Sequence, residues 1–173
     1  MAAIEVVVQQ VLFAVFPLAM AYAAISDLMT MTISNRLTLI LVAAFVVLSP
    51  LAGMDLGTFG LHWAAGGTVL AVAFACFAFG WIGGGDAKLA SVTALWLGWE
   101  STIEFIAIAS IFGGALTVLL LTFRRSVLPA FIIRQPWIQR LHDERAGVPY
   151  GVALAAAGLA TYPHTVWMQM AIG

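Results

Sequence analysis

Long runs of apolar residues dominate this chain and leave few folds open to it. Crossing the hydrocarbon core of a bilayer takes about 20 mostly apolar residues, with a range of about 17–25. Five segments meet this requirement, at residues 6–24, 36–52, 60–82, 102–123 and 148–170. Hydrophobic residues make up 63% of the chain and charged residues 9%, whereas a soluble domain has about 45–50% and about 25%. The pattern predicts an all-α protein that crosses a membrane several times.

A sixth apolar segment, 87–99, is short, and as a helix it would reach only about 20 Å. The charge pattern predicts that it nevertheless spans, because basic residues concentrate on the cytoplasmic side of membrane proteins. If it spans, one side holds all seven basic residues, which are Arg36, Lys88, Arg124, Arg125, Arg134, Arg140 and Arg145. The other side holds only acidic residues, namely Glu5, Asp55, Glu100 and Glu104. We therefore predict a polytopic bundle of about six transmembrane helices with both termini outside.

The 173 residues are expected to form a single transmembrane domain. The first apolar run is preceded by Glu5 rather than by a basic stretch, so we expect a retained helix and not a cleaved signal peptide. The longest cytosolic loop is 124–147, in which residues 134–145 mix apolar and charged side chains. That mixture predicts a short helix on the membrane surface.

Several classes of function are excluded at this point. No basic stretch is dense enough to bind a phosphate backbone, so no nucleic-acid partner is expected. The single cysteine, Cys76, cannot form an internal disulfide, and no Cys/His spacing predicts a zinc site. Cys76 is expected to be a small buried residue. Neither a metal nor a cofactor is predicted.

Two aspartates stand at the ends of apolar runs, where charges are costly and need a reason. Asp27 follows the first run and Asp86 the third. Odd-numbered spans that start outside both end inside, so the predicted topology puts the two carboxylates at one depth. The glycines at 83–85 directly precede Asp86, and they allow positive φ angles or a close approach of a neighbour.

Two adjacent carboxylates cannot both ionise easily and share a proton. One can then take a proton from water while the other protonates a carbonyl oxygen, which is metal-free peptide hydrolysis. Other interpretations stay open from the residues alone. Asp27 could cap a helix that starts near Leu28, and Asp86 one that starts near Ala87. The pair could also serve a small proton- or ion-coupled transporter, or the chain could be an assembly scaffold.

The sequence around the two aspartates resembles a known family. The segment Gly83-Gly84-Gly85-Asp86-Ala87-Lys88-Leu89 is similar to the GxGD motif of type IV prepilin peptidases. After Asp27, Ile33-Ser34-Asn35-Arg36-Leu37 is similar to the family's Ile-Pro-Asn turn and the following leucine, with serine in place of proline. Pro149-Tyr150-Gly151 resembles the element that opens the family's last span.

This resemblance implies a membrane aspartic endopeptidase that removes the short basic leader of prepilins or pseudopilins at the cytosolic face of a bacterial inner membrane. Asp27 and Asp86 would be the catalytic pair. The supporting motif residues would be Gly83, Gly84, Gly85, Lys88 and Asn35, of which Lys88 and Asn35 are expected only to shape the turns and anchor them at the headgroups. Expected partners are the lipid bilayer, the prepilin and other pilus-assembly components.

The chain departs from the bifunctional members of that family, which carry paired Cys-x-x-Cys motifs linked to N-methylation. It resembles instead the short CpaA/TadV-like members that serve Flp-type pili in tight adherence, so no methylation and no S-adenosylmethionine site are expected. Presenilin-like proteases usually pair their Gly-x-Gly-Asp with Tyr-Asp, but Ser26 precedes Asp27 here. Against a transporter, both aspartates fall at span ends and not at the bilayer midplane. Against a scaffold, three glycines lower helix stability without a structural gain.

Overall fold

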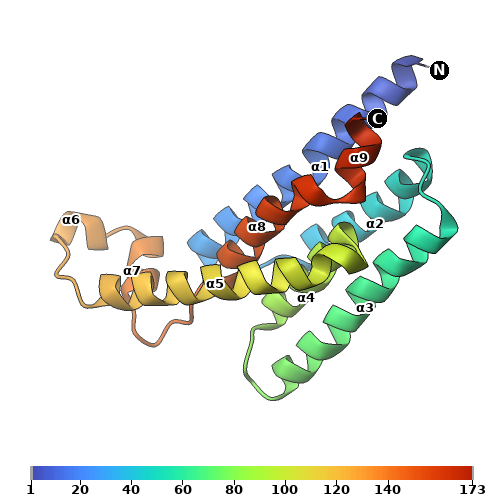
Figure 1. Ribbon diagram of the computed structural model, residues 1–173. Helices are drawn as coiled ribbons and strands as arrows, with labels where there is room; N and C mark the ends of the chain where they lie inside the picture. Colours follow the sequence, from blue (N-terminus) through green and yellow to red (C-terminus); the bar gives the residue numbers. More distant parts are fainter. Residues whose placement is uncertain (1, 173) are drawn as a thin grey trace.

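The computed structural model describes the backbone of residues 2–172, and in this part the regular structure is helical, with no strand. The all-α prediction is therefore confirmed. The long helices are α1 (Ala2–Thr30), α2 (Asn35–Leu51), α3 (Leu56–Ala78), α4 (Gly84–Leu97), α5 (Trp99–Arg124) and α8 (Tyr150–Thr161). Shorter pieces are α6 (Ala130–Ile133), α7 (Pro136–His142), the 3₁₀ turn η1 (Tyr162–His164) and α9 (Val166–Ile172). Figure 1 shows α1 beside α8, and α4 between α3 and α5.

Helix ends follow local capping chemistry. The side chain of Ser34 accepts a hydrogen bond from the Arg36 backbone N–H at 3.2 Å and begins α2. Asp55 does the same for α3, accepting from the Gly57 N–H at 2.9 Å. Both satisfy amides that have no partner inside the helix. Gly98 separates α4 from α5 with a φ of +81°, and an added Cβ there would lie 2.7 Å from Nε2 of His62. Only glycine fits this reversal.

The segment 148–170, predicted as one span, differs from a continuous helix. The 3₁₀ turn η1 interrupts it between α8 and α9, and Pro163 lies in that turn. Proline has no N–H and its ring clashes with the carbonyl four residues earlier, so a helix is interrupted there. In the loop 124–147, the helix predicted near 134–145 is present as α7 (Pro136–His142).

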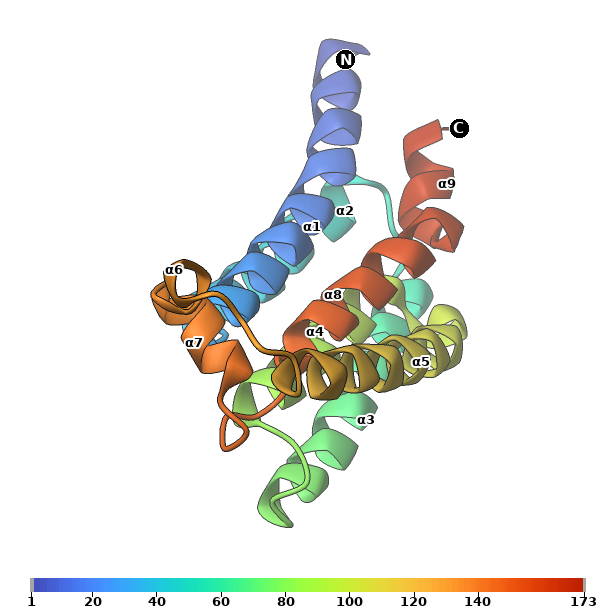
Figure 2. The same cartoon turned by 90° about the vertical axis from the view of Figure 1, so that its left-hand side faces the viewer.

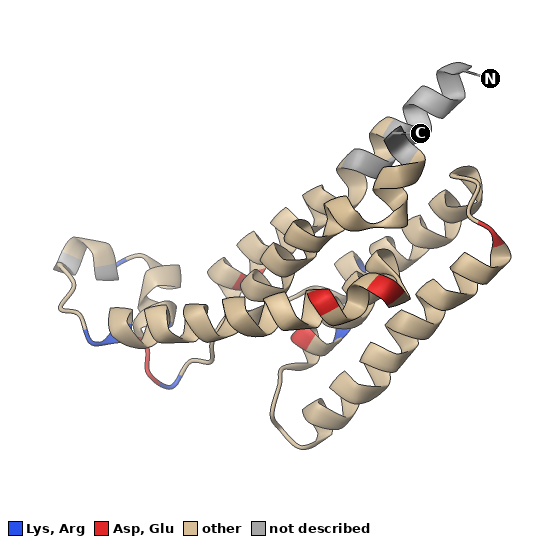
Figure 3. Cartoon of the chain, in the orientation of Figure 1, with Lys and Arg blue, Asp and Glu red and all other residues tan. Residues whose placement is uncertain are grey.

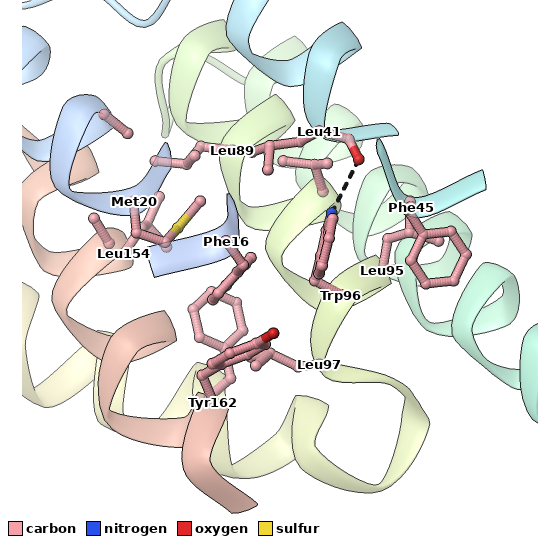
Figure 4. Close-up of a cluster of buried hydrophobic side chains, with 14 of the residues drawn as sticks. Phe16, Met20, Leu41, Phe45, Leu89, Leu95, Trp96, Leu97, Leu154 and Tyr162 are labelled. Atoms are coloured by element: carbon pink, nitrogen blue, oxygen red, sulfur yellow. Dashed lines mark hydrogen bonds between the residues drawn. The ribbon is translucent and has the colours of Figure 1, made fainter. Parts of the chain in front are cut away.

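Helix α4 lies at the centre of the bundle, and α2, α3, α5 and α8 all contact it. It corresponds to the short segment 87–99, and almost all its side chains from Ala87 to Leu97 are buried. Trp96 donates from Nε1 to the Leu41 carbonyl at 3.0 Å (Figure 4). Trp167 donates in turn to the Trp96 carbonyl at 2.6 Å. These bonds let large indole rings fill the core without a buried, unpaired N–H.

The outer surface is strongly apolar. Large apolar side chains are exposed along α2, α3 and α5, for example Leu39 (67%), Phe74 (64%) and Leu119 (68%). Helices α3 and α5 are each long and apolar enough to cross a membrane, and Ala14–Thr30 and Asn35–Leu51 are apolar but shorter. An exposed apolar surface of this extent is typical of contact with lipid.

Candidate active site

Asp27 lies in the last turn of α1 and is 5% exposed. Its Oδ2 accepts a hydrogen bond from the Gly151 N–H at 2.7 Å, and the nearby Val152 N–H also favours its ionised form. Both N–H groups belong to the first turn of α8, and the N-terminus of a helix favours negative charge. Asp27 is inside α1, so the interpretation that it caps a helix starting near Leu28 is wrong.

Asp86 lies in the first turn of α4, which Gly83 begins as the N-cap residue. Its Oδ2 would lie 3.0 Å from a Cβ added to Gly83, and the Gly83 backbone N–H opposes the rise of its pKa. The third residue of a capping box has a similar position. The helix therefore starts before Asp86, and the interpretation that Asp86 caps a helix from Ala87 is wrong. The carboxylate of Asp86 therefore lies at the start of α4, close to Gly83.

The three glycines before Asp86 permit close packing and not unusual dihedral angles. Gly83 has a φ of −73°, and the glycines with positive φ in the described chain are Gly53, Gly80 and Gly98. An added Cβ on Gly85 would lie 3.3 Å from Cβ of Ile33, and one on Gly84 would lie 3.3 Å from the ring of Phe77. Of the two roles considered for these glycines, the structure supports the close approach.

The two carboxylates line one cavity of about 910 Å³, although they are far apart in sequence. Its other walls are the segment after α1, the α3–α4 connection with Trp81 and Ile82, Thr117 of α5, and the start of α8. Burial raises the pKa of Asp86 to about 6, and the negative charge of Asp27 adds to the rise. Burial also raises the pKa of Asp27, against the opposing effect of the α8 N–H groups.

Lys88 and Asn35 interact with each other and not with the cavity. Lys88 Nζ donates to Asn35 Oδ1 at 2.8 Å, which ties the start of α2 to α4. Both residues are exposed, and neither lines the cavity that holds the aspartates. This geometry agrees with the expectation that the pair shapes the turns.

Several contacts that shape the site have no signal in the sequence. Ile33 lies between two glycines: an added Cβ on Gly151 would be 2.7 Å from its Cδ1, and one on Gly85 3.3 Å from its Cβ. Met31 has a φ of +55°, which turns the chain sharply after α1. The family-like turn 33–37 and the Pro149-Tyr150-Gly151 element contain two of these residues, but their mutual contact has no signal in the sequence.

Arginine side chains hold the loop 125–147 beside the cavity. Arg124 donates to the carbonyls of Leu141, Ala146 and Gly147 at 2.8–2.9 Å. Arg140 donates to the Met29 carbonyl at 2.6 Å, at the end of α1. Carbonyls at helix ends and in loops lack partners within their own element, so these guanidinium groups fix the approach to α8 and Asp27.

The arrangement suits general acid–base chemistry. The pKa values of the two carboxylates that line the cavity are raised, so the pair can hold one proton at mildly acidic pH. A base and an acid are thus available in one cavity. Among the described residues, no group of three or more Cys, His, Asp or Glu side chains is placed to hold a metal ion.

Comparison with known proteins agrees with this chemistry. A model of the type IV leader peptidase family matches residues 14–118, a region that includes both aspartates. No curated protein and no solved structure matches the chain. The family match covers more than half of the sequence, and we conclude that the chain belongs to the type IV leader peptidase family.

Proposed function

We propose that this chain is an aspartic endopeptidase that removes the short basic leader of type IV prepilins. The observation that carries the proposal is the meeting of Asp27 and Asp86 in one cavity, on α1 and α4. Family membership supports peptidase activity and a prepilin substrate. The carboxylate pair supports the aspartic mechanism, because it supplies both proton-transfer groups without a metal or a covalent intermediate.

The environments of the two aspartates suggest their roles. The hydrogen bond from the Gly151 N–H and the nearby Val152 N–H favour an ionised Asp27, whereas burial and the charge of Asp27 favour a protonated Asp86. Asp27 would take a proton from water, whose oxygen attacks the scissile carbonyl carbon, while Asp86 gives its proton to the carbonyl oxygen. When the C–N bond breaks, Asp27 returns its proton to the amine and the gem-diol returns one to Asp86. The pair would titrate as a unit.

We propose that α1, α2, α3, α4, α5 and the α8–α9 segment cross a bacterial inner membrane with both termini outside. In Figure 3 the connection between α2 and α3 and the first part of α5 carry acidic residues only. The blue segments gather at the opposite helix ends, by α6 and α7 and near the starts of α2 and α4. Excess Lys and Arg at one end supports a cytosolic location for that end. The cavity with Asp27 and Asp86 would then face the cytosol.

The substrate class is proposed to be the Flp-type prepilin, and the chain a short CpaA/TadV-like member. The support is the absence of Cys-x-x-Cys motifs from the sequence, which contains one cysteine. A proton- or ion-coupled transporter is less well supported, because the carboxylates lie at helix ends and not near the middle of the bundle.

The experiment is co-expression of this chain with a Flp-type prepilin and an immunoblot of the pilin. Wild type should shorten the pilin, and Asp27→Asn and Asp86→Asn should each leave it full length while still inserting in the membrane. Asp55→Asn is the matched control, because asparagine preserves the N-cap of α3 far from the cavity. Substantial cleavage by either dyad variant would remove that residue from the proposed pair. Failure of wild type would reject the substrate.

A further inference from the structure

An apolar groove lies between α3 and α5. It has a volume of about 370 Å³ and is lined by Ala65, Val72 and Cys76 from α3 and by Ile103 and Ile106 from α5, among others. Ile103 is 79% exposed and Val72 is 61% exposed. The described lining carries no charged side chain. The groove is therefore an apolar, lipid-facing surface that an apolar partner can fill.

The groove and the cavity of the aspartates are neighbours that share one lining residue. Ile82, in the α3–α4 connection, lines both. In Figures 1 and 2, the axes of α3 and α5 diverge from their first residues toward their last, and α4 begins near the end where they are farther apart. A helix bound between α3 and α5 would therefore have one end close to the cavity of Asp27 and Asp86.

One face of α5 connects the two spaces. Ile103, Ile106, Ser110, Gly114 and Thr117 share this face at the helical period of 3.6 residues. The first two line the groove and the last lines the aspartate cavity. Between them the side chains are small, and an added Cβ on Gly114 would meet nothing within 4 Å. The Ser110 hydroxyl donates to the Ile106 carbonyl at 2.8 Å, so this face leaves no unpaired hydroxyl there.

The length of the groove fits a membrane-embedded helix. From Ala65 to Cys76 along α3 the helical rise is about 16 Å, roughly half of the 30 Å hydrocarbon thickness. A substrate that has an apolar helix in the membrane and a peptide bond to be cut at the cytosolic boundary has this geometry. A helix in the groove would put its cytosolic end beside Ile82 and the dyad.

We propose that the groove between α3 and α5 binds the apolar transmembrane helix of the prepilin. The substrate would then reach the cavity of Asp27 and Asp86 from the side of the bundle. This inference rests on the proposed function. A second membrane groove of about 510 Å³, between α2 and α3, includes Leu70 and Lys88 in its lining but shares no lining residue with the dyad cavity. Because no residue of this second groove reaches the dyad cavity, it serves as the comparison site.

The only cysteine of the chain provides the test, because Cys76 lines the proposed groove. Single cysteines are scanned through the cytosolic half of the apolar helix of a Flp-type prepilin. Each is co-expressed with the Asp86→Asn chain, and disulfide cross-linking is induced by mild oxidation of membranes. The comparison chain carries Cys76→Ala and Leu70→Cys, which moves the cysteine to the other groove. Cleavage by the parent chain with its Asp86 intact is measured in parallel.

We expect cross-links to Cys76 with a helical periodicity along the substrate, and none to the cysteine at position 70. Cross-links at position 70 alone, or at neither position while the parent chain cleaves the prepilin, would overturn the groove assignment and leave the peptidase function standing. A parent chain that does not cleave would instead reject the Flp-type prepilin as the substrate, independently of the groove assignment.

A kinetic comparison distinguishes helix docking from accidental proximity. Val72→Trp should fill the groove and raise KM for full-length prepilin several-fold, with kcat little changed. Leu70→Trp, two residues away on the opposite side of α3, should leave KM unchanged. A short water-soluble peptide that spans the cut lacks the apolar helix, so Val72→Trp should not affect its cleavage. Equal effects of the two tryptophans on full-length prepilin would refute the proposal.

Discussion

Gly151 is the position where a single methyl group should damage the proposed catalysis without unfolding the chain. Its N–H donates to Asp27 Oδ2 at 2.7 Å. In Gly151→Ala the added Cβ would lie 2.8 Å from that oxygen and 2.7 Å from Cδ1 of Ile33. Both contacted atoms are at the ends of side chains, so the backbone of α8 can stay in place. The carboxylate of Asp27 has to move.

The size of the effect follows from these distances. Ordinary contact begins at 3.4 Å, so Oδ2 must move by about 0.6 Å, the difference from 2.8 Å. A hydrogen bond to a charged group contributes about 1.5–3 kcal/mol, and a misplacement of about 1 Å can cost about 100-fold in rate. We expect kcat/KM of Gly151→Ala to fall by roughly 10- to 100-fold.

The assay is prepilin cleavage by purified chain in detergent, with thermal unfolding measured on the same samples. Gly60→Ala is the matched control, because an added Cβ at that helical glycine meets nothing within 4 Å. It should cleave at the wild-type rate. The double variant Gly151→Ala/Ile33→Val removes Cδ1 of Ile33, one of the two contacts, and should stay slow because the contact with Asp27 remains.

Wild-type kcat/KM for a folded Gly151→Ala would refute the reasoning, because the position of Asp27 would then not depend on the start of α8. Full recovery in the double variant would show that the contact with Ile33, and not the displaced carboxylate, causes the loss. Either result would remove the Gly151 N–H from the proposed mechanism.

Further outcomes follow from the same structure. Asp86 must donate a proton and its pKa is about 6, so kcat/KM should fall as pH rises through about 6, and a profile that is flat from pH 5 to 8 would contradict this. The pKa of Asp86 in the folded chain is about 6, above the ordinary value of 3.8. The free energy of unfolding should therefore fall as pH rises from 3.8 to about 6, and thermal melting at several pH values can check this. Asp27→Asn should lower the Asp86 pKa, because it removes a charge that raises it, and carbon-13 NMR of labelled aspartate can follow the shift. Lys88→Met breaks only an exposed hydrogen bond to Asn35, so cleavage should persist and stability should fall by less than about 1 kcal/mol; complete loss of cleavage would give Lys88 a chemical role. Arg124→Gln loses bonds to three loop carbonyls, so amide hydrogen exchange in residues 125–147 should accelerate, and unchanged exchange would show that the loop is held by other contacts.

The sequence by itself determined the helical class and the location of the two aspartates at the ends of apolar runs. Apolar runs of sufficient length predict helices, and charges are costly within them, so Asp27 and Asp86 are confined to the ends of their runs. The motif around Gly83–Asp86 also pointed to the family that the comparison identified. These are local properties, which depend on residues close together in the chain.

The tertiary structure alone decided how the site is assembled. The bond between the Gly151 N–H and Asp27 joins residues 124 positions apart, and no local pattern encodes which helix start will face which carboxylate. Three other features also depend on residues far apart in the sequence. They are the close approach of Ile33 to Gly85 and Gly151, the hydrogen bonds from Arg124 to the loop, and the hydrogen bond of Lys88 to Asn35 outside the cavity. Apolar periodicity predicts which face of a helix is buried. Which helix packs against that face depends on the shapes of all the neighbouring elements together.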